Sequence, residues 1–399
     1  MTRNVKPSVP VSPESTIGIL GGGQLGRMMA IAAKHMGYRV HIFSTTGDSP
    51  AGQVADLEVV AAFTDLAAVE TFAKNVDVIT IETENIPTEC LDVTAQFVPS
   101  YPGNKALAVS QNRALEKQFV ADGGIPTAQF RIVKSLDELR DACKVIMPAV
   151  LKTTTGGYDG KGQAVIKSAA DVEAAWAALG TGEAILEEWI EYDFEFSIVG
   201  VRGATGSSAT YASIRNEHRN GILDVSISPS GLPVKVENIA ANLVQQSMQQ
   251  LGSVGVLTVE FFHRGGEVLV NEMAPRPHNS GHLTIEGHVT NQFEQHVRAI
   301  CGLPLGSTDQ LRPAAMANLL GDEWAGGQPK WHQGLSHPNT KLHLYGKEAP
   351  NLNRKMGHMT MLANDPEQAR EQVLAARKLL TVKSQEENDR SQVQCIESP

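Results

Sequence analysis

The sequence predicts an α/β protein of several domains, in which a doubly wound unit is followed by two β-rich segments. Three observations lead to this fold class. Residues 16–43 have the pattern of a strand, a glycine-rich turn, a helix and a strand. Residues 256–272 have the pattern of a β-hairpin, and residues 314–363 contain further strand-like runs. At 399 residues, the chain is long enough for two or three domains, each with its own core.

The composition is that of a soluble globular enzyme, with 42% hydrophobic and 20% charged residues. A net charge of −10 argues against general affinity for nucleic acid, so an anionic ligand needs a local basic site. The cysteines show no Cys-x-x-Cys spacing, which fits a reducing compartment. No apolar run is long enough to span a membrane, and residues 1–15 do not resemble a signal peptide. We therefore expect a cytoplasmic protein with no membrane partner.

The doubly wound unit begins with a strand at residues 16–20. A turn with glycines at 21, 22, 23 and 26 follows, then a helix over 24–35 and a strand over 38–43. The glycines match the dinucleotide-binding pattern, but the second strand ends in Phe43-Ser44, without the acid that would hold a ribose. Tight helix–strand packing is therefore favoured over a nicotinamide site, although the turn could still offer N–H groups to a phosphate.

Two acids end the next strand, over residues 76–81. Ligands of open α/β sheets lie at the carboxyl ends of strands, so Glu82 or Glu84 is a candidate substrate contact. A solvated pair of acids at a strand end fits the sequence equally well.

A glycine-rich loop follows the strand that carries Lys152. A long amphipathic helix is predicted over residues 104–123, then a strand over 148–152, the loop 153–162 and a return strand over 163–166. Four glycines make the loop a mobile flap whose amide groups could wrap phosphates, although it is not a Walker motif. A surface hairpin loop is the alternative.

The hairpin at residues 256–272 carries two carboxylates within an apolar sequence. If its turn centres on Gly265, Thr258 faces Glu272 and Glu260 faces Val270. Glu260 and Glu272 then share one face as diagonal neighbours, roughly 7–8 Å apart. Converging carboxylates suit a hard cation such as Mg²⁺, whereas an edge hairpin with both acids in water is the alternative.

Polar groups suited to a small anion follow the hairpin. The loop over residues 273–282 is broken by Pro and Gly and contains Arg276, His278, Asn279, Ser280 and His282. It offers a guanidinium, imidazoles and small donors beside the proposed metal.

A third, smaller segment holds a basic cluster. Strands are predicted over 314–320, 341–345 and 359–363, with a closing helix over 366–380. Lys347, Arg354 and Lys355 lie between them, which suits a substrate phosphate in an acidic chain.

These motifs resemble those of a known family. The hairpin with its two acids resembles the metal-binding end of the ATP-grasp ligases, and the run NEMAPRPHNSGH resembles one branch, the 5-(carboxyamino)imidazole ribonucleotide synthases. The resemblance covers residues 16–380 and implies a Rossmann-like N-terminal domain, a two-lobed ATP-grasp domain and a small β-rich C-terminal domain. The implied boundaries are a disordered extension (1–15), the three domains (16–115, 116–310 and 311–383) and a disordered tail (384–399).

The resemblance also implies an activity, its cofactors and its site residues. It implies ATP-dependent carboxylation of 5-aminoimidazole ribonucleotide with bicarbonate, through carboxyphosphate, by a homodimer that uses Mg²⁺ or, in its place, Mn²⁺. Arg276, Lys152 and Asp159 are the implied catalytic residues, and Glu260 and Glu272 the metal ligands. The implied ATP contacts are Arg113, Lys152, Gly157, Tyr158, Asp159, Gly160, Lys161, Gly162, Gln163, Glu187, Glu188, Trp189, Ile190, Glu195, His218, Asn271 and Glu272. The implied substrate contacts are Glu82, Tyr158, Asp159, Lys161, Arg276, His278, Asn279, Ser280, Lys347 and Arg354.

Three other functions compete with this interpretation. Formate-dependent glycinamide ribonucleotide transformylase has a similar loop up to His278, but differs from Asn279 onward. A nicotinamide oxidoreductase depends on the glycine turn alone and is opposed by Ser44. A non-catalytic nucleotide-binding module would need a broken metal pair, and both acids are present. Biotin carboxylase relatives carry Asn where this chain has Ala274.

Overall fold

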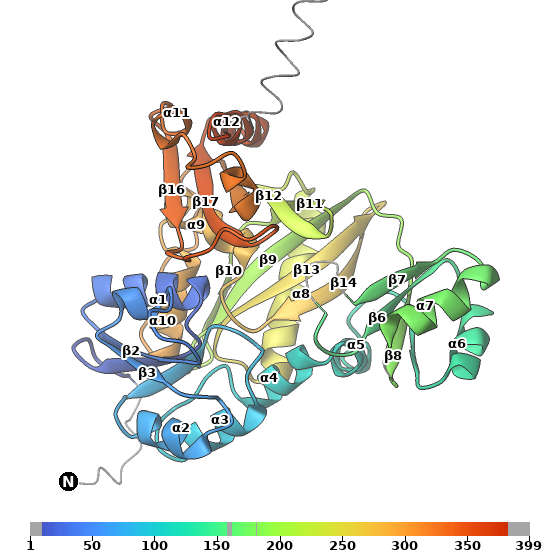
Figure 1. Cartoon of the computed structure of the whole chain (residues 1–399), viewed down its shortest axis with the longest axis horizontal. Helices are drawn as coiled ribbons and strands as arrows, with labels where there is room; N and C mark the ends of the chain where they lie inside the picture. The colour runs from blue at the N-terminus through green and yellow to red at the C-terminus, as the bar shows by residue number, and fades with distance from the viewer. Residues whose placement is uncertain (1–9, 158–161, 181, 382–399) are drawn as a thin grey trace, which may run out of the picture.

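The structure is a computed structural model that describes residues 10–157, 162–180 and 182–381. A large central sheet includes the C-terminal strands at one end, where the N-terminal body also lies, and a small lobe projects from the other end (Figure 1). The predicted N-terminal disorder at 1–9, the loop residues 158–161 and the C-terminal tail lie outside the described residues.

The N-terminal body is built on a four-stranded parallel sheet with strand order β3-β2-β1-β4. The predicted helix α1 lies directly after β1 and buries its apolar face, including Met28 and Met29. The elements are β1 (Thr16–Leu20), α1 (Gln24–His35), β2 (Arg39–Ser44), η1 (Gly52–Val54), β3 (Leu57–Val60), α2 (Leu66–Ala73), β4 (Val78–Ile81), α3 (Thr88–Thr94) and α4 (Asn104–Gln111).

Folded structure starts before the predicted boundary at Thr16. Val11 is buried in the core that contains α1, its N–H donates to the Cys301 carbonyl at 2.8 Å, and the Tyr38 hydroxyl donates to its carbonyl at 2.7 Å. An apolar side chain and satisfied backbone groups thus anchor this segment.

The predicted long helix over residues 104–123 is wrong, because the chain breaks at Asn112. Asn112 is extended (φ −133°, ψ 112°), and its side chain accepts hydrogen bonds from the N–H groups of Ala114 and Leu115. It is therefore the N-cap of a second helix, α5 (Arg113–Asp122). The break turns Arg113 and the following residues toward the small lobe.

The small lobe is a four-stranded antiparallel sheet with order β5-β8-β6-β7, covered by α6 and α7. The strand–loop–strand prediction around Lys152 is confirmed by β6 and β7. The elements are β5 (Phe130–Val133), α6 (Leu136–Cys143), β6 (Ala149–Thr153), β7 (Gln163–Ile166), η2 (Ala169–Asp171), α7 (Val172–Leu179) and β8 (Ala184–Glu188).

The central sheet has nine strands in the order β14-β13-β9-β11-β12-β15-β17-β16, with β10 paired to β9. Helix α8 packs on β9, β13 and β14, and α10 lies between β13 and α1. The elements in residues 194–300, which form the first part of this sheet and its helices, are β9 (Phe194–Arg202), β10 (Ser208–Thr210), β11 (Ile214–Arg219), β12 (Ile222–Ser228), α8 (Val234–Leu251), β13 (Gly255–Arg264), β14 (Glu267–Ala274), η3 (Asn279–Leu283), α9 (Thr284–Gly287) and α10 (Gln292–Ile300).

The predicted hairpin is confirmed, but its predicted register is wrong. Arg264 pairs with Glu267, so the turn is the two-residue loop Gly265-Gly266, with φ of 56° and 92°. The register then shifts beside Glu260, where β14 contains one extra residue, Asn271. The two-residue turn and this bulge each shift the pairing by one residue, so Glu260 lies directly opposite Glu272 instead of opposite Val270.

The C-terminal strands extend the central sheet. Strand β15 pairs antiparallel with β12, and β17 and β16 follow it. Helix α12 covers this end of the sheet (Figure 1). The elements are β15 (Ala314–Leu320), η4 (Gly321–Trp324), α11 (Trp331–Gly334), β16 (Thr340–Leu344), β17 (Lys355–Leu362) and α12 (Pro366–Lys378).

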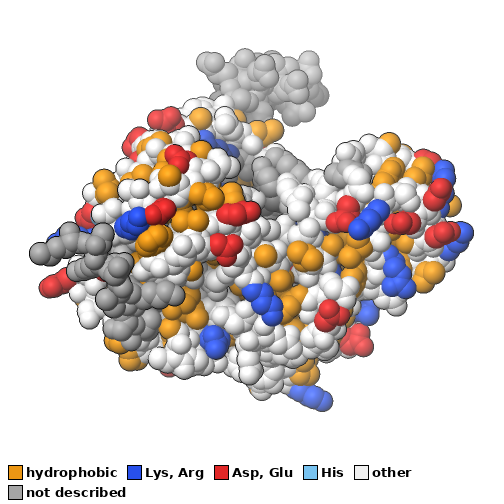
Figure 2. Space-filling model, turned by 90° about the horizontal axis from the view of Figure 1, so that it is seen from below, with side chains coloured by type: hydrophobic (Ala, Val, Ile, Leu, Met, Phe, Trp, Pro, Cys, Tyr) orange, Lys and Arg blue, Asp and Glu red, His pale blue; other side chains and the backbone are white. Residues whose placement is uncertain are grey.

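Acidic and basic side chains are interspersed with hydrophobic ones on the face seen from below (Figure 2). This face therefore carries no single-sign field among the residues drawn in colour. Within the described residues, no helix has the length and apolar character needed to cross a membrane.

Candidate active site

The two hairpin carboxylates lie side by side on one face of the central sheet. Glu260 pairs with Glu272 on one side and with Ser197 of β9 on the other, so their side chains share a face. Burial, followed by repulsion from Glu272, raises the pKa of Glu260 to about 8. Two carboxylates so placed hold a proton between them, or a cation.

The donor set fits a divalent ion that is completed by other ligands. No group of three or more His, Cys, Asp or Glu side chains forms a metal cage in the described part of the chain. Mg²⁺ usually binds through one or two carboxylates and shares nucleotide phosphates, so the pair Glu260 and Glu272 meets that requirement. Mn²⁺ accepts the same oxygen ligands.

His278 lies against this pair. Its Nε2 is 3.2 Å from Glu260 Oε1, and its Nδ1 is 3.0 Å from the Ser280 hydroxyl. Burial, then the nearby Arg276 and Lys355, lower the pKa of His278 well below its usual value. The raised pKa of Glu260 and the lowered pKa of His278 both favour the neutral form of each group in this contact.

The loop after the hairpin is held by its own polar groups. The Ser280 hydroxyl is 2.7 Å from that of Ser197, and Gln292 hydrogen-bonds both backbone groups of His278. The prediction that this loop is irregular holds only in part, because residues 279–283 form the short helix η3. Both side-chain polar atoms of Asn279 are buried and lack a partner within residues 10–157, 162–180 and 182–381, so they are available to a ligand.

Arg276 is paired with an acid of the N-terminal body. Its Nε donates to Glu84 Oε2 at 2.7 Å, and both side chains are largely buried. Glu82, by contrast, accepts hydrogen bonds from the N–H groups of Gly23 at 2.7 Å and Gly26 at 3.2 Å. The glycine turn was predicted to be able to bind a substrate phosphate, but this carboxylate already occupies these two donors.

Lys347 and Arg354 come together near Glu82. Burial, and then Arg354, lower the pKa of Lys347 to about 8, with Glu82 acting in the opposite direction. The Lys347 ammonium donates to the Lys355 carbonyl at 2.7 Å, and Arg354 donates to the Ala349 carbonyl at 2.9 Å. The predicted basic cluster is thus adjacent to Glu82, although the two lie far apart in sequence.

Lys152 and Glu187 meet on adjacent strands of the small lobe. Lys152 Nζ donates to Glu187 Oε2 at 3.0 Å, whereas Glu187 Oε1 is buried and has no partner in the described part of the chain. The chain continues through Glu188 and Trp189, whose N–H groups donate to the carbonyls of Gln129 and Pro148. Of the predicted residues that follow, Trp189 is exposed and Ile190 is buried.

Glu195 and His218 form a second pair, on β9 and β11. His218 Nδ1 is 2.7 Å from Glu195 Oε2, and the Tyr192 hydroxyl donates to the other oxygen at 2.6 Å. Burial acts to raise the pKa of Glu195, but the hydrogen bonds with His218 and Tyr192 act in the opposite direction and are stronger. The net effect is a pKa below the usual value. These residues line a cavity of about 270 Å³, which also contacts Arg370 of α12.

Arg113 lies at the start of the glycine-rich loop. Its guanidinium donates to the carbonyls of Gly157 at 2.6 Å and Thr153 at 3.3 Å. Gly162 (φ +70°) and Gln163 mark the loop's return to β7. The predicted contacts Tyr158, Asp159, Gly160 and Lys161 lie outside the described residues. Asn271, another predicted ATP contact, is the extra residue of the hairpin bulge.

Comparisons with known proteins identify the family. An ATP-grasp domain matches residues 118–293, a ribonucleotide synthetase preATP-grasp domain residues 14–111, and a phosphoribosylaminoimidazole carboxylase C-terminal domain residues 314–372. N5-carboxyaminoimidazole ribonucleotide synthase of Bacillus subtilis (strain 168) is 45% identical over 356 residues, covering 88% of this chain and 92% of the relative. The chain belongs to the N5-carboxyaminoimidazole ribonucleotide synthase family.

Solved structures of this synthase family share the fold. An ADP complex of an N5-carboxyaminoimidazole ribonucleotide synthetase superposes with a TM-score of 0.88 at 42% identity, covering 92% of this chain and 98% of that one. The Aspergillus clavatus synthase in complex with ADP and 5-aminoimidazole ribonucleotide gives 0.83 at 30% identity, covering 92% and 98%. The predicted family and fold class are therefore confirmed.

Sequence reasoning missed two buried charges of this synthase-family chain. Glu116 and Lys117 follow one another on α5, and both are buried. Glu116 accepts a hydrogen bond from the Met273 N–H at 2.6 Å, and burial, followed by Glu272, raises its pKa to about 8. In sequence the two residues resemble an ordinary solvated Glu-Lys step, and only the break at Asn112 would have suggested a change in helix direction.

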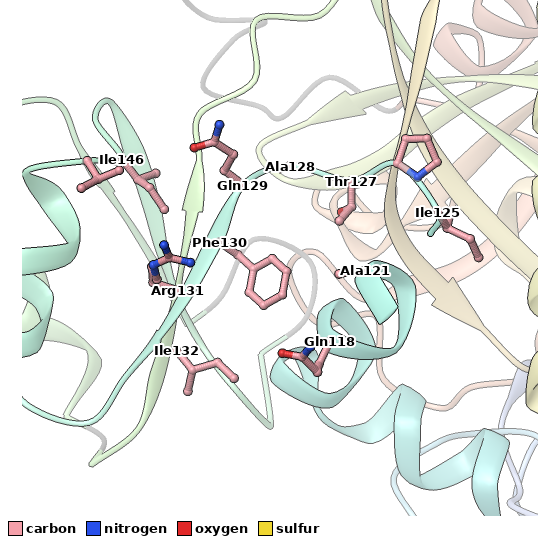
Figure 3. Close-up of a pocket in the computed structure, with 12 residues that line it drawn as sticks. Gln118, Ala121, Ile125, Thr127, Ala128, Gln129, Phe130, Arg131, Ile132 and Ile146 are labelled. Carbon is pink, nitrogen blue, oxygen red and sulfur yellow. The ribbon is translucent and has the colours of Figure 1, made fainter. Parts of the chain in front are cut away.

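A further cavity lies away from this site. It measures about 730 Å³ and lies between α5, the segment linking the lobes and β5, as shown by Gln118, Thr127 and Phe130 (Figure 3). None of the predicted site residues lines it.

Proposed function

We propose that this chain catalyses the ATP-dependent carboxylation of 5-aminoimidazole ribonucleotide with bicarbonate, which gives N5-carboxyaminoimidazole ribonucleotide, ADP and phosphate in de novo purine biosynthesis. The observation that carries this proposal is the match over 92% of the length of the Bacillus subtilis synthase. The reaction is a carbon–nitrogen ligation of the ATP-grasp type.

The nucleotide lies between the small lobe and the central sheet in this proposal. Glu187 Oε1, which is unpaired among the described residues, accepts a hydrogen bond from the exocyclic amine of adenine. The backbone of residues 188–190 lies beside the base. Glu195, which is positioned by His218, accepts hydrogen bonds from the ribose hydroxyls. Arg113 and Lys152 meet the phosphates together with Asn271 and the glycine-rich loop, including Gly157, Tyr158, Asp159, Gly160, Lys161, Gly162 and Gln163.

Glu260 and Glu272 hold the divalent ion against the phosphates. Mg²⁺, or Mn²⁺ in its place, neutralises phosphate charge when it is bound there. Lys152 places a further positive charge beside the transferring phosphoryl group. Closure of the loop over residues 156–162 would keep water from a labile carboxyphosphate.

Bicarbonate and the amine substrate occupy the space beside His278. Arg276 binds bicarbonate and steadies the carboxyphosphate, for which its fork geometry is suited. The buried unpaired amide of Asn279, with Ser280 and His278, supplies further polar contacts. Glu82 faces the aminoimidazole, alongside the loop residues Tyr158, Asp159 and Lys161, while Lys347 and Arg354 bind the ribonucleotide phosphate.

We further propose that the chain works as a homodimer in the cytoplasm, as the sequence resemblance implies. Sedimentation of the purified protein tests the first part, and fractionation of cells that express it tests the second.

The test of function is an assay of ADP release with bicarbonate present. Adding 5-aminoimidazole ribonucleotide should stimulate release and yield the carboxylated product. In a second set of assays, glycinamide ribonucleotide and formate replace 5-aminoimidazole ribonucleotide and bicarbonate. Stimulation by that pair alone would replace the proposed activity with the transformylase reaction.

A further inference from the structure

Lys117 is a fully buried lysine that the proposed chemistry does not use. Its side chain is 2% exposed. Its ammonium lies 3.0 Å from the Thr127 hydroxyl, 3.3 Å from the Val270 carbonyl and 3.4 Å from Glu187 Oε2. These partners come from the segment linking the lobes, from β14 and from β8 of the small lobe. All three ammonium hydrogens therefore have an acceptor within the protein.

The two carboxylate oxygens of Glu187 have different surroundings. Oε2 contacts both Lys117 and Lys152, whereas Oε1 is buried and has no partner among the residues that the structure describes. A buried acceptor that makes no hydrogen bond destabilises the fold. Such an atom therefore indicates that a ligand supplies the donor. In the proposed function, on which this inference rests, that donor is the exocyclic amine of adenine.

We propose that Lys117 is the positioning residue for base selectivity, which holds Glu187 as a carboxylate turned so that Oε1 faces the nucleotide base. An ionised acceptor favours adenine, which presents an amine there. It disfavours hypoxanthine and guanine, which present a carbonyl oxygen at the same place.

Lys152 cannot perform this task alone. It lies on a strand beside the glycine-rich loop and is 18% exposed, and in the proposed function it turns to the phosphates. Glu187 would then be a buried anion without a countercharge if Lys117 were not fixed beneath it. Its bonds to Thr127 and Val270 hold Lys117 in place whether or not nucleotide is bound.

The surrounding charges support this assignment. Burial alone raises the pKa of Glu187, but Lys117, and after it Lys152, outweigh burial and leave the pKa lowered. These two lysines, from α5 and β6, are the charged groups that face Glu187, and Glu116 faces Lys117 from the same helix. Removing Lys117 would therefore raise the pKa of Glu187.

The test is Lys117→Met, which keeps an unbranched side chain and removes the charge. We expect KM for ATP to rise by roughly 10- to 150-fold, the range for a lost charged hydrogen bond. KM for ITP should change little, so the preference for ATP over ITP should collapse. KM for ATP should also become pH-dependent, falling as the pH rises and Glu187 ionises.

Two further variants serve as controls. Thr127→Val removes a hydrogen bond of Lys117 but keeps its charge, so selectivity and the flat pH profile should persist. Glu187→Gln should lose the preference for ATP. Adding Lys117→Met to Glu187→Gln should lower the preference no further. This double variant removes both charges of the Lys117–Glu187 pair, so it serves if the single lysine variant does not fold.

The outcomes separate the role of Lys117 from the adenine site itself. A retained preference in Lys117→Met together with a lost preference in Glu187→Gln overturns the role of Lys117 and leaves the adenine site standing. Additive losses in the double variant also overturn it. A retained preference in Glu187→Gln instead overturns the adenine assignment within the proposed function.

Discussion

Glu260 and Glu272 lie directly opposite each other on β13 and β14, because the bulge at Asn271 shifts the register of the hairpin next to them. If Asn271 instead continued the regular ladder, it would face Glu260, Glu272 would face Val259, and the two carboxylates would lie on opposite faces of the sheet. The bulge thus brings two like charges together, and such an arrangement is stable only with a proton or cation between them.

Replacing Glu272 by Gln tests the metal assignment. The change keeps the shape of the side chain and removes one of the charges that face the ion, so ATP turnover should fall by orders of magnitude while the fold survives. Glu267→Gln, at the other end of the same strand, is the matched control and should be active. Near-normal turnover of Glu272→Gln at saturating Mg²⁺ would show that the ion binds elsewhere.

The raised pKa of Glu260 predicts how the metal-free protein responds to pH. A carboxyl that keeps its proton in the folded state contributes stability below its unfolded pKa, and this contribution disappears as the pH rises toward about 8. The melting temperature without metal should therefore decrease over this range. Glu260→Gln should flatten that decrease, as measured by scanning calorimetry. A decrease of the same size in both proteins would contradict the raised pKa of this group.

Arg354→Ala separates the two phosphate sites. Loss of a charge-assisted contact with the ribonucleotide phosphate should raise KM for 5-aminoimidazole ribonucleotide by about 10- to 150-fold. KM for ATP should stay nearly constant, because Arg354 is on the C-terminal segment beside Lys347. Lys341→Ala, on the neighbouring strand β16, is a charge-matched control. An equal rise in both constants would indicate disturbed domain closure.

The glycine turn should not bind a dinucleotide. Glu82 already accepts hydrogen bonds from the N–H groups of Gly23 and Gly26, so these donors are not free to bind a pyrophosphate. A calorimetric titration with NADH should give no measurable heat of binding. Binding in the micromolar range would restore the nicotinamide alternative.

Much of the fold could be predicted from local sequence patterns. The helix after the glycine turn, the strands around Lys152 and the hairpin at Gly265-Gly266 are all present, because hydrophobic periodicity and turn residues act over short distances. The break at Asn112 was missed because a capping asparagine competes with a helical pattern that continues across it.

The site was predicted less completely for a different reason. Which charges are buried depends on contacts between distant segments, such as those of Lys117 with Glu187 and Val270. The pairing of Arg276 with Glu84 likewise joins residues 192 positions apart. Local sequence indicates that such residues are polar, but not which partner meets them.

The pairing of β12 with β15 has a consequence for dividing the chain. A fragment ending before β15 would leave β12 as a bare edge, with backbone groups of residues 225–228 unpaired and the apolar side chains of Val225 and Ile227 uncovered. Exposed edges of this kind pair with other chains and lead to aggregation. The C-terminal segment therefore cannot be removed as an independent module, and a shortened chain without it should form insoluble assemblies even though every residue of the hairpin site is retained.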